Sequence, residues 1–442
     1  MIEVLESRTM MAATPLGVSE IATSNGTQLR ITGTDAADQI SVSRNDTGLL
    51  IKNTGGWETT ATGNYTSILV NGGKGNDKIT FDASVSTKAI MYGGVGNDKL
   101  TGGSGNDRLY GGLGTNQLIG GAGNDVLVTI GGKGDDRSTG GIGRDSFWVD
   151  SAKAEKVTDL SSEESASGSV HRVTNFSGIG ITAGNKAASR ELTGGGFADP
   201  TLTHSGMSYR NFSNAQLFSD AGPAADDVSQ GYIGDCYYLA TLASIAKVDP
   251  SKIRESVVDL GDGTYAVQFT RGGKNVFVRV DADLATWSNG ALAYADMGAE
   301  NSMWVAVMEK AYTYFRTGAG TYASIEAGWM SEAYSAHGAS SNSTFSASSG
   351  QNLLALIQSE LAAGKSVTFA VQTPSNGAAL IGCHAYSVES VGYDANGNPA
   401  TLRLRNPWGI DGAGSDGSND GYVTITAQQA LGSFMGLVSA SV

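Results

Sequence analysis

The feature that most constrains the fold of this chain is a nine-residue repeat. From Gly93 the sequence reads GGVGNDKLT, GGSGNDRLY, GGLGTNQLI, GGAGNDVLVTI, GGKGDDRST and GGIGRDSFW, and GGKGNDKIT at Gly72 is an earlier copy. So regular a period predicts a repeat architecture whose units stack on one another. A flexible linker rich in glycine, asparagine and aspartate is the alternative, but a linker has no physical reason to keep a fixed period.

Each position of the repeat has a physical role. Paired glycines permit the left-handed backbone conformations of tight turns, and the aspartate and the turn carbonyls offer the hard oxygen ligands that Ca²⁺ prefers. The apolar residue two places after the aspartate is expected to point inward, at Ile79, Leu100, Leu109, Leu127 and Phe147. The repeat therefore predicts a parallel β-roll that binds Ca²⁺.

Over about residues 70–150 the pattern resembles the RTX repeats of haemolysin-type calcium-binding proteins. The resemblance implies six aspartate ligands for Ca²⁺: Asp77, Asp98, Asp107, Asp125, Asp136 and Asp145. Asn116 takes the aspartate position in one unit, so a weaker site is expected there. In the unit that begins at Gly131, Ser138 stands where the inward apolar residue is expected.

The segments beside the repeats differ in composition. Residues 1–20 are expected to be a leader or a disordered segment. Alternating apolar and polar residues in LRITGTDAADQISVSRNDTGLLIKN predict short strands, so residues 21–150 are expected to form one strand-rich, calcium-binding roll. Residues 151–210 are polar and rich in serine, glycine and alanine, which predicts a linker.

Charge and hydropathy exclude several classes of partner. The chain of 442 residues has 43 acidic and 29 basic residues and a net charge of -14. Nucleic acids and anionic membranes select basic surfaces, so neither is the expected main partner. No apolar run approaches the 18 or so residues of a membrane span. Divalent cations are the more natural partners of such an acidic chain.

The segment SQGYIGDCYYLATLASIAK, residues 229–247, contains one of only two cysteines. Leu239, Leu242 and Ile245 recur at helical spacing, which places Cys236 in the first turn of a buried helix. Unpaired backbone N–H groups and the helix dipole there are expected to lower the pKa of its thiol. Three interpretations remain: a buried structural thiol, a disulfide with Cys383, and a nucleophile.

A cysteine nucleophile needs a histidine, and the sequence has four. His384 is the only one in an alternating, strand-like segment, GCHAYSVESVGYD, and a second strand, ATLRLRNPWG, leads to Asn406. Two adjacent antiparallel strands bring His384 and Asn406 together, so that the amide oxygen accepts from one ring nitrogen. Cys236, His384 and Asn406 then have the roles of a papain-type triad.

Five segments in order resemble the calpain protease core over about residues 215–430: QGYIGDCYYLATLASIA, MWVAVMEKAYTYF, TYASIEAGW, HAYSVESVGYD and LRLRNPWG. The resemblance implies an α+β papain-like fold, with a helical part at 211–335 and a β-rich part at 336–442. It also implies roles for six residues. Cys236 is the nucleophile, His384 is the general base and acid, and Asn406 orients His384. Gln230 donates to the oxyanion, Trp408 shields the histidine from water, and Asp227 is a calcium ligand.

The chain departs from the calpain pattern at three places. Tyr237 replaces the tryptophan that usually follows the cysteine, and Cys383 stands where glycine is common. C2-like and EF-hand domains of the kind found in animal calpains do not follow in the sequence, so calcium control through such domains is not expected.

The sequence as a whole predicts a multidomain protein, an all-β calcium-binding roll followed by a cysteine endopeptidase that cleaves proteins or peptides. The alternative is a calcium-dependent surface or adhesion module with a catalytically silent calpain-like domain. Because RTX repeats usually accompany export, we expect a secreted or cell-surface protein of a bacterium. Substrate preference, oligomeric state and calcium control of activity are left open.

Overall fold

The structure is a computed structural model that describes residues 15–23, 25–132, 134–151, 155–177, 192, 194, 197–413 and 417–442, apart from the side chain of Glu300. The chain forms two compact units. Unit 1 comprises Met1–Asn175 with Ser189–Leu192, and unit 2 comprises Phe176–Ala188 with Thr193–Val442. Most of the expected leader, residues 1–14, lies outside the described residues, but β1 (Gly17–Thr23) begins within it. Among the described residues, no helix has the length and apolar character needed to cross a membrane.

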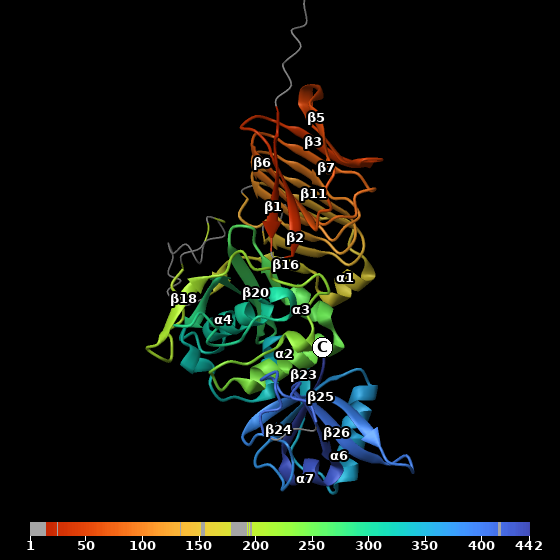
Figure 1. Ribbon diagram of the computed structural model, residues 1–442, viewed down its shortest axis with the longest axis vertical. Coiled ribbons are helices and arrows are strands. Elements are labelled where there is room, and N and C mark those ends of the chain that lie inside the picture. Colours follow the sequence, from red (N-terminus) through yellow and green to blue (C-terminus); the bar gives the residue numbers. More distant parts are fainter. Residues whose placement is uncertain are drawn as a thin grey trace, which may run out of the picture. The chain divides into compact units, whose positions relative to one another are not determined.

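Unit 1 is built on two eight-stranded sheets (Figure 1). The first has the order β1, β2 (Gly26–Thr32), β6 (Ser67–Lys74), β8 (Ala89–Val95), β10 (Arg108–Leu113), β12 (Val126–Val128), β14 (Ser146–Asp150) and β16 (Val170–Val173). The second has the order β15 (Lys156–Val157), β13 (Arg137–Ile142), β11 (Gln117–Ala122), β9 (Lys99–Thr101), β7 (Lys78–Phe81), β3 (Gln39–Asn45), β4 (Gly48–Lys52) and β5 (Glu58–Ala61).

From β6 to β16 successive strands of the chain alternate between these two sheets, and the neighbours within each sheet are parallel. The predicted parallel β-roll is therefore confirmed. Its interior holds the expected apolar residues, because Ile79, Leu100, Leu109, Leu127 and Phe147 are all 0% exposed. The turns require glycine: a β-carbon on Gly96, whose φ is +148°, would lie 1.6 Å from the carbonyl oxygen of Gly75.

The roll extends further than the sequence predicted. Within the expected linker, β15 pairs with β13 and β16 pairs with β14, and α1 (Ser162–Ser167) lies between them. A two-residue strand such as β15 has little intrinsic preference for its conformation, but it gains ladder hydrogen bonds from a sheet that already exists. The linker prediction was therefore wrong for residues 156–173. Its central part, residues 178–191, lies outside the described residues.

The first part of unit 2 contains helices and two sheets. Its helices are α2 (Cys236–Val248), α3 (Pro250–Ser256), α4 (Trp304–Arg316) and α5 (Met330–Ala336). One sheet has the order β17 (Phe176–Ser177), β21 (Lys274–Asp281), β20 (Thr264–Arg271) and β19 (Val257–Asp259), and the other pairs β18 (Met207–Asn211) with β22 (Asp283–Trp287). The helix that carries Cys236 was predicted, but the β strands of this part were not.

The second part of unit 2 is a six-stranded antiparallel sheet with the order β23 (Ser340–Thr344), β28 (Phe434–Ser441), β24 (Ser366–Val371), β25 (His384–Tyr393), β26 (Pro399–Arg405) and β27 (Tyr422–Thr426). It is accompanied by α6 (Gly350–Ala362) and α7 (Ala427–Ser433). The predicted pairing of the strands that lead from His384 and to Asn406 is confirmed, since Ser387 of β25 faces Arg405 of β26.

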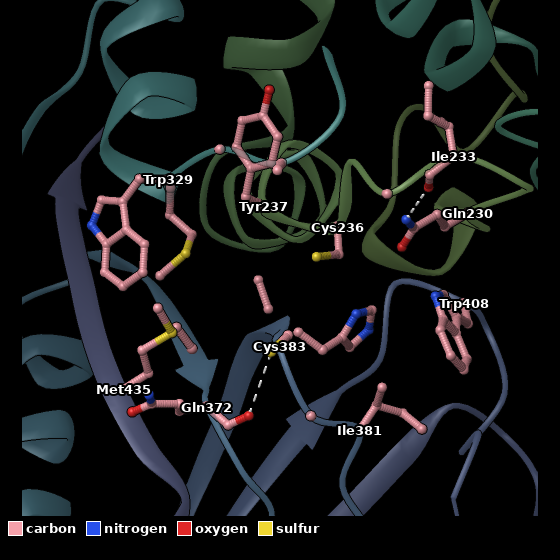
Figure 2. A pocket seen from close by; sticks show the side chains of 18 of the residues that line it. Gln230, Ile233, Cys236, Tyr237, Trp329, Gln372, Ile381, Cys383, Trp408 and Met435 are labelled. Atoms are coloured by element: carbon pink, nitrogen blue, oxygen red, sulfur yellow. Dashed lines mark hydrogen bonds between the residues drawn. The ribbon is translucent and has the colours of Figure 1, made fainter. Parts of the chain in front are cut away.

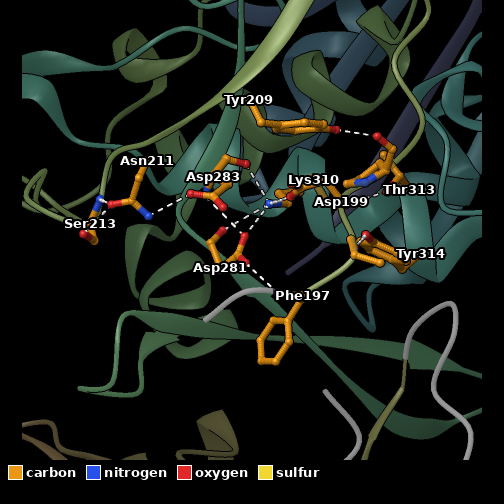
Figure 3. A network of polar contacts seen from close by, with 12 residues as sticks. Phe197, Asp199, Tyr209, Asn211, Ser213, Asp281, Asp283, Lys310, Thr313 and Tyr314 are labelled. Carbon is orange, nitrogen blue, oxygen red and sulfur yellow. Dashed lines mark hydrogen bonds and ion pairs between the residues drawn. The ribbon is translucent and has the colours of Figure 1, made fainter. Parts of the chain in front are cut away.

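A buried lysine fixes the segment that precedes β18 (Figure 3). The ammonium nitrogen of Lys310 lies 2.6 Å from a carboxylate oxygen of Asp199 and 2.7 Å from one of Asp281, and it donates to the carbonyl oxygen of Asp283. The backbone N–H of Phe197 also donates to Asp281. Lys310 thus forms ion pairs with Asp199 and Asp281, while the carboxylate of Asp283 accepts from the side-chain amide of Asn211 at 2.8 Å. We assign no metal to these residues.

Candidate active site and calcium-binding ladders

Unit 2 contains a cavity of about 520 Å³ that brings several of the predicted site residues together. Cys236, His384, Gln230 and Trp408 all line it. Figure 2 shows Gln230 and Trp408 on one side of Cys236, and Trp329 and Met435 on the opposite side. Met435 was not predicted, because a single apolar residue in a sequence carries no signal that it faces a cleft.

Cys236 is the first residue of α2 and is only partly buried. Its predicted location is confirmed, but the predicted low pKa is wrong. Burial raises the pKa of the thiol to about 11; the backbone N–H of Ala385 lowers it in part, and the neighbouring Asp235 carboxyl raises it further. The loss of hydration of a thiolate here outweighs what the helix terminus provides.

His384 begins β25 and is buried among Tyr386, Trp408 and Asn406. Its Nε2 lies 2.8 Å from Oδ1 of Asn406. Burial lowers the pKa of the imidazole to about 4, and the hydrogen bond to Asn406 only partly opposes this shift. Because Asn406 accepts from Nε2–H, the other ring nitrogen, Nδ1, is left as the basic atom.

Asn406 is itself held in place from two directions. Its Oδ1 accepts from the backbone N–H of Trp408 at 3.0 Å, and its Nδ2 donates to the carbonyl oxygen of Asp411 at 3.1 Å. The ring of Trp408 lies 5.0 Å from that of His384, measured between ring centroids. Trp408 thus both covers His384 and fixes Asn406. The part of Asp411 was not predicted, since a loop carbonyl leaves no sequence signal.

Gln230 precedes Cys236 in a loop that long-range contacts fix. Its backbone N–H donates to the carbonyl oxygen of Pro407 at 2.7 Å. Its side-chain Nε2 donates to the carbonyl oxygen of Ile233 at 2.6 Å (Figure 2). An amide nitrogen carries two hydrogens, so this contact leaves Gln230 with one N–H for another acceptor.

The two departures from the calpain pattern both line the cavity. Tyr237 is buried, and its hydroxyl donates to the carbonyl oxygen of Ile325 at 3.1 Å. Its ring lies so close to Gly328 that a β-carbon there would be 2.4 Å away. Cys383 is exposed and has a left-handed φ of +51°. Both cysteines are free thiols in this structure, so the alternative of a disulfide is not realised in it.

Asp227, the calcium ligand that the calpain resemblance implies, is engaged in hydrogen bonds in this structure. Its Oδ1 accepts from the backbone N–H of Ala299 at 2.9 Å. Its Oδ2 accepts from the indole N–H of Trp304 at 2.8 Å and from the backbone N–H of Ala224 at 2.9 Å. These contacts join the loop before Gln230 to the residues that lead into α4, and calcium binding by Asp227 stays a prediction.

In unit 1 the predicted calcium ligands form two rows of hydrogen bonds, which we call ladders. Along each ladder the backbone N–H of one residue donates to a side-chain oxygen of the equivalent residue in the next turn of the β-roll. The first ladder comprises Asp38, Asp77, Asp98, Asn116 and Asp136. The second comprises Asp107, Asp125, Asp145 and Glu164, with Ala89 as its first donor. Asp38 and Glu164 were not predicted, because neither stands in a copy of the repeat.

One carboxylate oxygen of each predicted aspartate ligand accepts from a backbone N–H of its ladder. The second oxygen of Asp107 accepts from the backbone N–H of Gly103 at 2.8 Å, but in four other aspartates the second oxygen has no donor. The Oδ2 atoms of Asp77, Asp98, Asp136 and Asp145 are buried without a hydrogen-bond donor. Burial raises the pKa of Asp77 and Asp136 to about 6 and that of Asp145 to about 7. Buried acceptors that lack donors suit a hard cation, so these residues fit Ca²⁺.

Asn116 preserves the hydrogen bond of the first ladder but replaces the second carboxylate oxygen of an aspartate by an amide nitrogen. Its Oδ1 accepts from the backbone N–H of Asp98 at 3.0 Å, as an aspartate would. Its Nδ2 takes the place of the second carboxylate oxygen and donates to the carbonyl oxygen of Gly112 at 3.4 Å. A donor and a missing negative charge both disfavour Ca²⁺ at this rung.

Comparison with known proteins agrees with both halves of the chain. Residues 208–433, about half of the chain, match the calpain family of cysteine proteases, and residues 92–127 match the RTX calcium-binding nonapeptide repeat in four copies. The chain thus combines a cysteine protease domain with calcium-binding repeats. It belongs to the calpain family.

Similar proteins include calpain clp-1 of Caenorhabditis elegans, 31% identical over 225 residues, which are 46% of this chain and 28% of that protein. The catalytic subunit of calpain-1 of Bos taurus is 31% identical over 228 residues, 47% of this chain and 31% of that protein. The calpain-type cysteine protease DEK1 of Arabidopsis thaliana is 31% identical over 210 residues, 43% of this chain and 9% of that protein. The chain therefore spans less than a third of the length of these relatives.

Proposed function

We propose that this protein is a cysteine endopeptidase whose catalytic residues are Cys236, His384 and Asn406. The observation that carries the proposal is the 2.8 Å contact between His384 Nε2 and Asn406 Oδ1 in a cavity that Cys236 also lines. This contact fixes the imidazole so that Nδ1 is the free basic atom in the same cavity as the thiol. A thiol, a base and an orienting amide are the parts that nucleophilic catalysis by cysteine requires.

The pKa values favour a particular order of proton transfer. With the pKa of Cys236 raised to about 11 and that of His384 lowered to about 4, the resting pair is a neutral thiol and a neutral imidazole. The thiol proton therefore passes to His384 Nδ1 as sulfur attacks the peptide carbonyl. His384 then gives this proton to the leaving amine, and water, deprotonated by the same nitrogen, hydrolyses the acyl-enzyme.

The oxyanion formed in the attack needs donors beside Cys236. We assign this role to the backbone N–H of Cys236 and to the remaining N–H of Gln230. The loop of Gln230 is anchored through Pro407, one residue after Asn406, so the donor and the base are held by adjacent parts of the chain. Preorganised donors of this kind stabilise the transition state more than the substrate.

The opposite side of the cavity, around Trp329, Met330 and Met435, is apolar. We assign it to the acyl side of a peptide substrate, because an apolar wall favours an apolar side chain there. Within the described residues the substrate thus meets polar donors on one side of Cys236 and apolar surface on the other.

The proposal is tested by casein digestion with the full chain and its Cys236→Ala variant. We expect the variant to lose cleavage, while a Cys383→Ser control keeps it. Cleavage that survives Cys236→Ala contradicts the assignment. Labelling of Cys236 by an E-64-type epoxide is a second measurement, and its absence at every Ca²⁺ concentration favours the catalytically silent surface or adhesion module.

We further propose that the protein acts outside the cell. The roll carries calcium-binding repeats, and Ca²⁺ is abundant in extracellular fluids and scarce in cytoplasm. Cell fractionation with an antibody against the natural protein tests this location.

A further inference from the structure

The two ladders of the roll end in different ways. The parallel pairing of Arg137 with Lys156 places Glu155 next to Asp136, where the following rung of the first ladder belongs. The second ladder likewise ends in a glutamate, Glu164, beyond Asp145. Both glutamates are buried and both lie outside the repeats, so one serves as an internal comparison for the other.

Glu164 ends the second ladder with its carboxylate fully used. One oxygen accepts from the backbone N–H of Asp145 at 2.8 Å, and the other accepts from the backbone N–H of Ser161 at 2.7 Å. The pKa of Glu164 is lowered, because these hydrogen bonds outweigh the effect of its desolvation. The charge of this carboxylate is thus stabilised by backbone donors and needs no cation.

Glu155 is only half satisfied. Its Oε2 accepts from the hydroxyl of Thr129 at 2.8 Å, while its Oε1 is buried without a hydrogen-bond donor. Its carboxyl group is in contact with that of Asp136, whose Oδ2 also lacks a donor. Glu155 is 4% exposed and Asp136 is 1% exposed, and neither forms an ion pair with a basic side chain of the described part of the chain.

More negative charge gathers at the same place. Asp150, which is 3% exposed, repels both carboxylates. Two buried carboxyl groups in contact require either a shared proton or a cation between them.

Backbone carbonyl oxygens lie close to the carboxylate of Asp136. A β-carbon placed on Gly132 would lie 3.0 Å from Oδ2 of Asp136, 3.4 Å from the carbonyl oxygen of Gly112 and 3.5 Å from that of Gly114, so these three oxygens surround one small space. Oxygen atoms from carboxylates and backbone carbonyls are the donors that Ca²⁺ selects, whereas transition metals favour nitrogen and sulfur.

We propose that Asp136 and Glu155, with the carbonyl oxygens of Gly112 and Gly114, bind one Ca²⁺ ion at the end of the first ladder. Glu155 is the residue specific to this site, since it lies 28 residues beyond the segment that matches the calcium-binding repeats, residues 92–127. In this arrangement Ca²⁺ compensates the negative charge at the end of the first ladder, as backbone N–H donors compensate that of Glu164 at the end of the second.

The test counts Ca²⁺ ions bound by the full chain, by equilibrium dialysis with radioactive Ca²⁺ near neutral pH. We expect Glu155→Gln to bind one ion fewer per chain than the unchanged protein. Glu163→Gln removes the same charge from an exposed position nearby and is expected to leave the number unchanged. Glu164→Gln, at the end of the second ladder, is also expected to leave it unchanged.

An unchanged number of ions in Glu155→Gln overturns the proposal and makes Glu155 a purely structural residue. If that variant does not fold, Thr129→Val takes its place, since it removes only the hydroxyl that holds Glu155. We then expect one ion to bind about tenfold more weakly, and unaltered affinity at every site overturns the proposal. Because only bound Ca²⁺ is measured, the outcome is independent of proteolytic activity.

Discussion

His384 and Asn406 are 22 positions apart in the sequence, yet Nε2 of the histidine lies 2.8 Å from Oδ1 of the asparagine. The pairing of β25 with β26 produces this proximity, because His384 begins the first strand and Asn406 follows the second. The hydrogen bond sets the orientation of the ring and leaves Nδ1 basic. A sheet register thus determines which nitrogen of the imidazole is available to a thiol.

Asn406→Ala is expected to lower kcat by about 100-fold, because general acid–base catalysis of this kind contributes roughly 10² to 10⁴ and the variant leaves the imidazole without its orienting acceptor. The effect should fall on kcat more than on KM, since Asn406 is fully buried and does not contact substrate. Steady-state kinetics on a fluorogenic peptide measure it. Asn396→Ala, in an exposed turn, is the control, and equal kinetics for the two variants would contradict the role of Asn406.

Gln230→Ala is expected to lower kcat by about 10² to 10³, the usual cost of removing one oxyanion donor. Gln230→Glu replaces the donor by an acceptor of similar size and should not restore activity. Single-turnover acylation rates separate this effect from product release. An acylation rate in Gln230→Ala equal to that of the unchanged protein would show that Gln230 only supports its loop.

Asn116→Asp is expected to strengthen calcium binding by the first ladder. The new carboxylate oxygen takes the place of an amide nitrogen that now donates to Gly112, so an acceptor and a negative charge replace a donor. We expect one additional Ca²⁺ ion per chain in equilibrium dialysis. Gln117→Glu adds the same charge one residue further on and serves as control; a gain of equal size there would attribute the effect to net charge alone.

Removal of Ca²⁺ is expected to loosen the roll. The Oδ2 atoms of Asp77, Asp98, Asp136 and Asp145 are buried without donors, so without a cation the desolvation and mutual repulsion of these carboxylates oppose folding. Circular dichroism and thermal melting of the full chain, with and without EGTA, should differ at the transition of unit 1. Identical spectra and melting curves under the two conditions contradict this expectation.

Acid should destabilise unit 2 through His337. This imidazole is buried in contact with the rings of Tyr238 and Phe269, and burial lowers its pKa from 6.5 to about 3. Between these values the unfolded chain binds a proton that the folded chain does not, so stability falls as the pH falls below 6.5. At pH 5 the loss is about 2 kcal/mol.

Urea unfolding at pH 7 and pH 5 measures this loss. His337→Phe removes the titrating group and keeps a ring in the cavity, so its free energy of unfolding should fall by about 2 kcal/mol less over the same interval. The carboxyl groups of the chain titrate equally in both proteins and cancel in the difference. Equal losses in the two proteins would rule out His337 as the cause.

The repeat and the calpain-like segments could be predicted from the sequence because each is defined by the spacing of residues close together in the chain. A nine-residue period, with Leu100 and Leu109 each two places after an aspartate, is enough to predict parallel strands and an apolar interior. The helix that starts at Cys236 and the strands that lead from His384 and to Asn406 follow in the same way from spacing and alternation. These patterns express backbone preferences that neighbours in the chain determine.

The properties that depend on burial and on distant contacts were not predictable from such patterns. The pKa of Cys236 is raised because desolvation in the folded unit outweighs the helix terminus, and Asp227 accepts from Ala299 and Trp304, which lie 72 and 77 positions further along the chain. The position of Glu155 beside Asp136 follows from the register of a two-residue strand. Sequence alone thus determined the elements that follow from local patterns: the strands of the repeat, the helix at Cys236 and the strands at His384 and Asn406. The tertiary structure decided which further strands form, how each group is solvated and which groups meet, because desolvation and charge interactions sum over neighbours that are remote in the chain.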